Sequence, residues 1–310
     1  MTEGKNMRKV VVTGANGFIG STLIRKMIDH HIQVIAIDMT FSPSKLPESE
    51  YIKKYSLSLS EIDKLRELLE KNDYDTFYHF AWRGVNGKEK ADPSVQIENI
   101  DMTLNCAKLA YESGCKKFLC AGTIAEQAIS SLDSLIKTNG GMMYGVAKHC
   151  TQLMLETYCK NVGLNYVWMQ FSNIYGPQNK TGNLVSYTLE EILNNREATF
   201  GPALQIYDFI YIDDLINAVY RLGENETGAD NYFIGSGSPK ILKDYLYQIG
   251  TICGKSELIK IGLRPDDGIK YSAEMFDNSK LISDIGEYVS VTFEAVSYTH
   301  LRAHETRHDL

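Results

Sequence analysis

The fold of this chain is decided by the stretch KVVVTGANGFIG, which spans residues 9–20. Its first five residues are rich in valine and predict a β-strand, whereas the apolar pattern that begins at Phe18 predicts an amphipathic helix. Gly14 permits the tight turn between them, Gly17 lets backbone N–H groups approach a pyrophosphate at the positive helix end, and Gly20 allows close packing of helix and strand. A glycine triplet in this setting predicts a dinucleotide site, with contacts from Gly14, Gly17, Phe18, Ile19 and Gly20.

An acidic residue follows the glycine loop at the distance that such a site requires. Asp38 ends the second apolar run, residues 33–38, eighteen residues after Gly20. Its carboxylate can accept hydrogen bonds from both hydroxyls of an adenosine ribose, and it would repel a 2′-phosphate. The sequence therefore predicts NAD rather than NADP as the cofactor, with a solvated turn aspartate as the alternative interpretation of Asp38.

Strand-like and helical segments alternate along the first half of the chain. Further apolar runs of strand length occupy residues 74–81, 116–121 and 165–171, and helical periodicity occupies residues 18–30, 62–70 and 95–112. This alternation predicts an α/β fold with a Rossmann-type, doubly wound parallel sheet. After residue 171 the pattern becomes turn-rich, apart from a strand-like run at 205–212. We therefore expect an NAD-binding domain of residues 7–173 and 207–235, and a smaller, discontinuous substrate-binding domain of residues 174–206 and 236–296.

Composition excludes several classes of protein. The 310 residues are 44% hydrophobic and 23% charged, as in ordinary soluble globular proteins, and the formal net charge of −7 without a basic stripe argues against nucleic acid as a partner. No apolar run approaches the ~20 residues of a membrane span, and residues 1–9 lack the apolar core of a signal peptide. Six cysteines without a Cys-x-x-Cys pair predict reduced thiols and no metal site. We expect a cytoplasmic protein with no membrane partner.

Tyr144 and Lys148 stand four residues apart and carry the candidate chemistry. A helix with about 3.6 residues per turn places both on one face, where the lysine ammonium would lower the pKa of the phenol. The tyrosine would then be a usable acid or base near neutral pH. The spacing alone is also compatible with an exposed helix pair, so this interpretation depends on the glycine loop and on a hydroxyl partner.

With these features in this order, the chain resembles the extended short-chain dehydrogenase/reductases, and specifically the NAD-dependent epimerase/dehydratase family that acts on nucleotide sugars. The resemblance extends from about residue 8 to residue 295. Besides Tyr144 and Lys148, it is carried by the motifs TGANGFIG (13–20), HFAW (79–82), AGT (121–123), NIYGP (173–177), DFIYIDD (208–214) and RPDD (264–267).

The resemblance implies roles for particular residues. Thr123 would hydrogen-bond the reacting sugar oxygen, Tyr144 would be the general base or acid, and Lys148 would hold the nicotinamide ribose hydroxyls. Ala81 would pass its backbone near the cofactor. The expected contacts to the nucleotide sugar, in addition to Thr123, are Asn173, Asn183 and Arg264, although turn capping by the asparagines and a surface ion pair of the arginine are alternatives. The family also implies a homodimer through the helix that carries Tyr144.

Other residues depart from the family pattern or have a structural interpretation. Ile124 and Ala125 replace the Asp-Glu pair with which the family's 4,6-dehydratases remove water, so dehydration is disfavoured unless Glu126 substitutes. Gln170 and Tyr207 stand where arginines are often found, and residues 58–59 are Ser-Leu in place of Asp-Leu beside the adenine. The motif histidine at position 79 is expected to be a packed core residue, because it lies in a strand covered by helices.

The leading functional hypothesis is an NAD-dependent nucleotide-sugar epimerase, acting at C4 by transient oxidation and re-reduction of the sugar. The first alternative is an NAD(P)H-dependent 4-ketosugar nucleotide reductase, which shares every catalytic residue. A non-catalytic NAD-sensing regulator is a further alternative, disfavoured because a sensor does not need Thr123, Tyr144 and Lys148 together.

Residues 297–310 break the composition of the chain. They hold three of the seven histidines and contain the sequence HETRH at 304–308, which matches the zinc-hydrolase pattern His-Glu-x-x-His. We discount the match, because no chain follows it to supply a third ligand or a supporting fold. Residues 297–310 resemble a non-native read-through tail, and our hypothesis is that the native sequence is cut near Ala295, where members of the family continue into a final helix.

Overall fold

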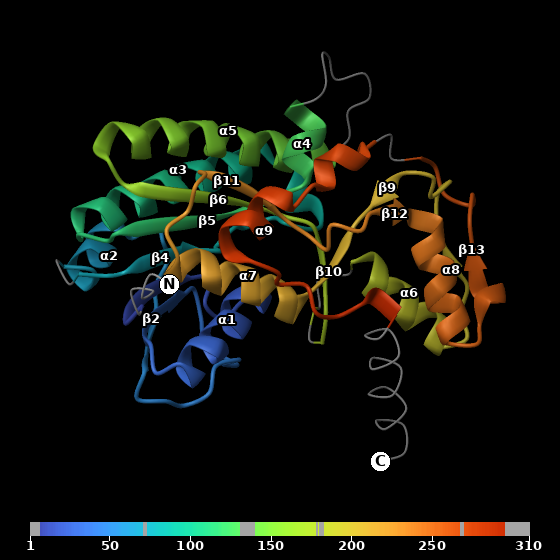
Figure 1. Ribbon diagram of the computed structural model, residues 1–310, viewed down its shortest axis with the longest axis horizontal. Helices are drawn as coiled ribbons and strands as arrows, with labels where there is room; N and C mark the ends of the chain where they lie inside the picture. The colour runs from blue at the N-terminus through green and yellow to red at the C-terminus, as the bar shows by residue number, and fades with distance from the viewer. Residues whose placement is uncertain are drawn as a thin grey trace.

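The computed structural model describes residues 7–70, 73–130, 140–177, 179, 183–266 and 270–294. Their main feature is a seven-stranded parallel sheet in the order β11-β6-β5-β4-β1-β2-β3 (Figure 1). The strands are β1 (Lys9–Thr13), β2 (Gln33–Asp38), β3 (Ile52–Ser56), β4 (Thr76–His79), β5 (Lys117–Thr123), β6 (Asn165–Phe171) and β11 (Asn231–Ile234). The predicted doubly wound α/β fold is confirmed. The expected tail, residues 297–310, lies outside the described residues.

The strand order reverses at β1. This strand pairs in parallel with β2 on one side and with β4 on the other, so that Thr13 lies between Ile37 and His79. The chain leaves β1 toward β2 and β3, then crosses back to continue from β4 outward on the other side. Loops that leave the two halves in opposite directions open a crevice at the carboxyl ends of the strands, which is where such sheets bind ligands.

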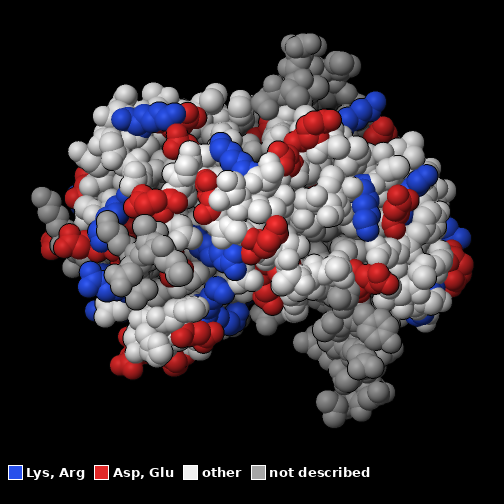
Figure 2. Space-filling view, in the orientation of Figure 1, with Lys and Arg blue, Asp and Glu red and all other residues white. Residues whose placement is uncertain are grey.

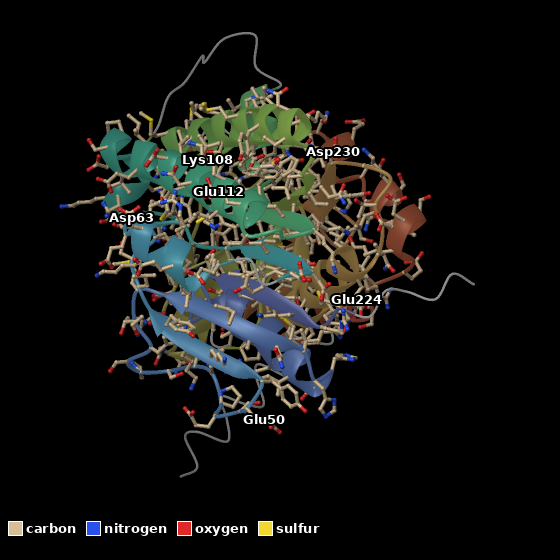
Figure 3. The ribbon with its side chains drawn as sticks, turned by 90° about the vertical axis from the view of Figure 1, so that its left-hand side faces the viewer. Glu50, Asp63, Lys108, Glu112, Glu224 and Asp230 are labelled. Carbon is tan, nitrogen blue, oxygen red and sulfur yellow. The ribbon has the colours of Figure 1, made fainter. Side chains whose placement is uncertain are left out.

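Helices cover both faces of the sheet. One face packs against α1 (Phe18–Asp29) and α7 (Ile212–Glu224), and the other packs against α2 (Ile62–Leu68), α3 (Pro93–Glu112) and α5 (Gly140–Val162). Figure 3 views the sheet end-on. The labelled Glu112 is the last residue of α3 and the labelled Glu224 is the last residue of α7, so the two residues lie in opposite helix layers. Because helices cover both faces, the sequences of the central strands are nearly continuous apolar runs. These runs allowed the strands to be predicted from the sequence.

The predicted boundaries agree with the structure in the central strands and less well at the sheet edge. The runs at 9–13, 33–38 and 165–171 coincide with β1, β2 and β6, whereas the strand within the run at 74–81 is limited to Thr76–His79. No sequence pattern predicted β3. This edge strand has the sequence IKKYS and no fully buried residue, because it pairs on one side only and packs loosely.

A smaller part of the chain lies beside the carboxyl ends of the strands (Figure 1). Its helices are α6 (Leu184–Leu193) and α8 (Leu242–Ile252), and its short strands pair as β7 (Asn173–Tyr175) with β10 (Phe209–Tyr211), β9 (Ile206–Tyr207) with β12 (Lys240–Ile241), and β8 (Ala198–Thr199) with β13 (Ile259–Lys260). A separate apolar cluster holds α6 and α8 together.

The remaining short elements are α4 (Ala125–Ser130), α9 (Ser279–Ile285) and three 3₁₀ turns, η1 (Lys88–Ala91), η2 (Ser256–Leu258) and η3 (Ala273–Phe276). The predicted division assigns residues 236–296 to the smaller domain, yet α9 within this range packs against α7 and β11 through Leu281 and Ile285. In the described part of the chain no helix is both long and apolar enough to cross a bilayer.

Candidate active site

A cavity of about 900 Å³ opens at the carboxyl ends of β1, β4 and β5 and extends to the smaller part of the chain. It lies at the switch point of the sheet, where the fold predicts a ligand. The residues predicted from the sequence that line it are Gly14, Gly17, Phe18, Ile19, Gly20, Asp38, Ala81, Thr123, Tyr144, Lys148, Asn173 and Asn183. The structure thus brings together residues that are up to 169 positions apart in the chain.

The glycine loop is held in a conformation that only glycines allow. Gly14 has a φ of +69°, and a Cβ on it would lie 2.8 Å from the backbone nitrogen of Ala81. A Cβ on Gly20 would clash with the carbonyl oxygen of Gly14. Helix α1 begins after Gly17, whose position carries no side-chain cap. The first backbone N–H groups of this helix therefore face the cavity without a side-chain acceptor, as a pyrophosphate requires.

Asp38 is fixed at the end of β2, beside this loop. Its Oδ2 accepts a hydrogen bond from the backbone N–H of Asn16 at 2.8 Å, and its Oδ1 accepts one from the N–H of Met39 at 2.8 Å. Each carboxylate oxygen keeps a further lone pair for a ribose hydroxyl. Ser58 and Leu59 line the same end of the cavity, where the family places the adenine.

Thr123 and Tyr144 meet at the inner end of the cavity. Thr123 ends β5, Tyr144 lies in the first turns of α5, and the threonine side chain hydrogen-bonds the phenol. Burial raises the pKa of Tyr144 above its usual value, the nearby Glu126 carboxylate adds to this effect, and the hydrogen bond to Thr123 opposes it. The direction is opposite to the lowering expected from the Tyr-x-x-x-Lys spacing, because desolvation of the phenol is the largest effect.

Lys148 lies one helical turn farther along α5, and its side chain is buried. Its Nζ donates a hydrogen bond to the carbonyl oxygen of Ala121 at 2.7 Å and lies 3.6 Å from the centroid of the Trp82 ring. Desolvation lowers the pKa of Lys148 to about 8, and Coulomb interactions with Cys120 and Glu126 oppose the shift. Backbone oxygen and indole face thus replace part of the hydration that the ammonium loses.

Trp82 is a site residue that the sequence reasoning left without a role. Its ring meets the Tyr144 ring edge to face, with centroids 6.1 Å apart, and its Nε1 donates to Gln96 Oε1 at 3.0 Å. The ring is therefore held between the tyrosine and the lysine. The sequence signal that could have identified it as a site residue was its position directly after Ala81, in the motif at 79–82.

The neighbours of Thr123 do not form a dehydratase pair. Ile124 is 5% exposed and packs with Phe233 and Phe276, and Ala125 begins α4. Glu126, which could have substituted for the missing acid, has no exposed surface and does not line the cavity. Its carboxylate is bonded to protein groups beneath the site, so it is not positioned to remove water from a sugar.

The predicted substrate residues divide into two groups. Asn173 and Asn183 line the cavity, although each also has a structural bond: Asn173 Nδ2 donates to the Asp208 carbonyl oxygen at 3.1 Å, and Asn183 caps α6. Arg264 does not line the cavity. Its exposed guanidinium donates to Thr199 Oγ1 at 2.8 Å and to the Tyr187 hydroxyl at 2.6 Å.

Two aromatic residues complete this side of the cavity, Tyr207 and Phe209, and the sequence assigned a substrate role to neither. They come from β9 and β10, immediately before α7. Position 207, where the resemblance led us to expect an arginine, supplies a flat ring with a hydroxyl. This wall of the cavity is therefore aromatic.

His79 is a core residue, as the sequence predicted. It is 1% exposed, its Nδ1 lies 2.8 Å from Thr13 Oγ1, and its Nε2 lies 3.1 Å from Thr103 Oγ1. Burial, with a smaller contribution from Lys148, lowers the pKa of His79 to about 3, so the ring is neutral at physiological pH. Within the described ranges, no cluster of His, Cys, Asp and Glu side chains has the arrangement of a metal site.

A Rossmann-type sheet with a glycine loop, a carboxylate at the end of β2 and a Thr-Tyr-Lys cluster is typical of the extended short-chain dehydrogenase/reductases. Consistent with this, a sequence model of the NAD dependent epimerase/dehydratase family matches residues 10–235. The chain belongs to this NAD-dependent family, and it is an enzyme that uses NAD as its cofactor.

Relatives of known activity include a dTDP-4-dehydro-6-deoxyglucose reductase from Escherichia coli, which is 29% identical over 266 residues, 81% of this chain and 83% of the relative. A UDP-glucose 4-epimerase from Halalkalibacterium halodurans is 26% identical over 272 residues, 79% of this chain and 80% of the relative. Among solved structures, a UDP-glucose 4-epimerase from Thermotoga maritima matches with a TM-score of 0.81 and 20% identity, covering 96% of this chain and 99% of that one. This structural likeness supports the fold.

Proposed function

We propose that this enzyme transfers hydride between NAD and C4 of a nucleotide-linked hexose, and that it acts as a 4-ketosugar reductase. The observation that carries the proposal is the meeting of Thr123, Tyr144 and Lys148 at one end of the cofactor cavity. Apolar residues occupy positions 124 and 125, so hydride transfer has no accompanying dehydration chemistry. NAD in its reduced form supplies the hydride.

The chain's own groups handle the proton and the orientation of the sugar. The Thr123 hydroxyl is placed to hydrogen-bond the C4 oxygen, and the Tyr144 phenol is placed to donate a proton to that oxygen as the carbonyl becomes a hydroxyl. Because the pKa of Tyr144 is raised, the phenol is protonated at neutral pH and is suited to act as an acid. Lys148, with its ammonium buried beside Trp82, would bind the nicotinamide ribose.

Two reactions share this hydride step, and the 29% identity to the dTDP-4-dehydro-6-deoxyglucose reductase leads us to put reduction first. The sequence favoured a 4-epimerase because Asp38 selects NAD, and biosynthetic reductases more often use NADPH. However, a dTDP-6-deoxy-L-talose 4-dehydrogenase (NAD(+)) from Aggregatibacter actinomycetemcomitans is 28% identical over 243 residues, 76% of this chain. NAD selection is therefore compatible with a reductase. The 4-epimerase remains the second candidate, supported by the relatives with that name.

The two candidates differ in whether the cofactor is consumed. Purified enzyme is incubated with dTDP-4-dehydro-6-deoxyglucose and NADH, and separately with UDP-glucose and UDP-galactose without added reductant. Stoichiometric loss of NADH with formation of a 4-hydroxy sugar supports the reductase, whereas epimerisation without net NADH loss supports the epimerase. Absence of both reactions with these and other nucleotide sugars, in a protein that binds NAD, would refute the proposal.

The proposed substrate site consists of Thr123, Asn173 and Asn183, with the aromatic wall of Tyr207 and Phe209. These residues join the carboxyl end of β5 to the smaller part of the chain, which we propose to be the substrate-binding domain. Arg264 is implied by the resemblance alone, because in the structure its guanidinium is bonded outside the cavity.

We also propose that the enzyme is a homodimer in the cytoplasm. Helices α3 and α5 pack side by side, and each exposes large apolar residues of the kind that mark interaction surfaces. These residues are Ile97, Tyr111, Met143, Val146, Leu153 and Met154. All six cysteines are free thiols, which suits a reducing compartment. In the view of Figure 2, acidic and basic side chains are interspersed without a continuous basic patch.

A further inference from the structure

A carboxylate is sealed beneath the catalytic threonine. Glu126 lies in the first turn of α4 and has no exposed surface. Its Oε1 accepts a hydrogen bond from the backbone N–H of Thr123 at 2.6 Å, and its Oε2 accepts bonds from Trp168 Nε1 at 2.6 Å and Gln170 Nε2 at 3.2 Å. All three partners are donors. A carboxylate satisfies them, whereas an amide would turn one of its own donors toward another donor.

The surrounding backbone is shaped around this arrangement. Gly122 precedes the threonine on β5, and a Cβ on it would lie 2.9 Å from Glu126 Oε1 and would clash with Trp168 Nε1. Gln170 is itself oriented, because Gln127 Nε2 donates to its Oε1 at 3.0 Å. Two strands and a helix therefore contribute to one buried polar network with no spare volume.

The network connects the carboxylate to the catalytic lysine. The Trp168 indole donates its N–H to Glu126, and its ring lies 5.7 Å from the Nζ of Lys148. The charge of Glu126 affects the pKa of four titratable groups on α5, β5 and β6, which are Lys148, Tyr144, Cys120 and Tyr166. Only Lys148 among these four is cationic when protonated.

We propose that Glu126 is a positioning residue for hydride and proton transfer: its buried carboxylate fixes the Thr123 backbone and the Trp168 indole beneath the Thr123, Tyr144 and Lys148 cluster. The proposal deepens the reductase function proposed above and rests on it. Glu126 does not line the cavity, so it acts through Thr123, Tyr144 and Lys148. In ketosugar reduction, the proton moves from the Tyr144 phenol to the sugar oxygen, and Glu126 exchanges no atom.

Electrostatics supports this role. Desolvation raises the pKa of Glu126 to about 7, with the Trp168 hydrogen bond, Lys148 and the Thr123 N–H opposing the shift. Ionised Glu126 in turn raises the pKa of both Tyr144 and Lys148. At neutral pH and above, the buried charge therefore extends the range in which the phenol retains the proton that it must donate.

The first test compares Glu126→Gln with Glu156→Gln, which removes a charge from the outer face of α5, where Glu156 pairs with Lys160. For ketosugar reduction, Glu126→Gln should move the alkaline limb of the kcat/KM profile to lower pH by about one unit, because the pKa of Tyr144 and of Lys148 both fall. We also expect kcat to fall about tenfold or more while KM for the sugar changes less than about threefold. Glu156→Gln should retain the wild-type profile.

The second test needs no substrate, so it separates failure of this proposal from failure of the proposed function. The chain has two tryptophans. In a Trp82→Phe protein, the emission of Trp168 should titrate near neutral pH as Glu126 loses its proton, and the added Glu126→Gln change should abolish this titration. Circular dichroism and thermal unfolding check that both proteins are folded.

The outcomes are distinct. Emission that titrates identically before and after the Glu126→Gln change, or an unshifted alkaline limb in a folded Glu126→Gln enzyme, overturns the proposal. If the wild-type enzyme reduces no ketosugar but the Trp168 titration depends on Glu126, the proposed reductase function fails while the buried charge is established.

Discussion

Tyr144→Phe tests the assigned proton donor most directly. The substitution removes only the phenol oxygen and retains the ring that meets Trp82 edge to face. Proton donation by a positioned side chain contributes about 10² to 10⁴ in rate. We expect the upper part of this range, a loss of about 10³ to 10⁴ or ~4 to 5.5 kcal/mol of barrier. The reason is that Lys148, which could otherwise supply a proton at this end of the cavity, is bonded through its Nζ to the Ala121 carbonyl oxygen at 2.7 Å.

The binding and folding of this variant should change little. The lost hydrogen bond to Thr123 accounts for about 1 kcal/mol of stability, and affinity for NADH should stay within about threefold, because the glycine loop and Asp38 are untouched. Single-turnover oxidation of enzyme-bound NADH measures the chemical step, and calorimetry measures cofactor binding. Tyr247→Phe is the matched control, since Tyr247 is 44% exposed on α8. A rate within about tenfold of wild type would refute the assignment of Tyr144 as the acid.

Three further predictions concern the cofactor site and the core. Gly20→Ala should weaken NADH binding at least about tenfold, because a Cβ would clash with the loop carbonyl, whereas Gly228→Ala, which faces a side chain at 3.3 Å, should not; calorimetry measures both. Asp38→Ala should raise the NADPH to NADH ratio of kcat/KM about tenfold or more, and an unchanged ratio would remove Asp38 from the ribose site. His79 has a folded-state pKa of about 3, against 6.5 for an ordinary histidine, so the unfolded state binds the extra proton. The contribution of neutral, buried His79 to the free energy of unfolding is complete above pH 6.5. It is lost as the pH falls toward 3, by about 1.4 kcal/mol per pH unit. Denaturant titrations of His79→Gln should show a shallower decline over this range, and parallel curves would contradict the argument.

Much of the fold was readable because its central elements are locally determined. Strands β1, β2 and β6 are buried on both faces, and their apolar runs predicted their bounds. The glycine loop could also be predicted, since the tight turn and the close approach of backbone to ligand and helix to strand depend on three glycines within seven positions. Strand β3 escaped detection, because an edge strand with lysines carries neither a continuous apolar run nor a clean alternation.

The sequence predicted which residues belong to the candidate site better than it predicted the properties of those residues. Twelve of the thirteen site residues predicted from the sequence line the cavity, and the exception is Arg264, whose guanidinium is bonded outside it. Trp82 and Tyr207 had no assigned role. The wall of the cavity is formed by side chains from loops that are distant in the sequence, so the sequence does not show which side chains will line it. The pKa of Tyr144 was expected to fall, and burial raises it instead.

The sequence by itself determined the class of fold, and it predicted the place of the dinucleotide and the tyrosine that we propose as the acid, because each depends on a short segment whose residue types have few alternative uses. Tertiary structure alone decided the surroundings of that acid. Glu126 lies 18 residues before Tyr144 in the chain and on a different helix, and Trp168 lies 42 residues beyond the glutamate. Only the packing of α4 and α5 against β5 and β6 places a buried negative charge where it can raise the pKa of a phenol. Desolvation and Coulomb interactions depend on distance in space, and sequence separation does not supply it.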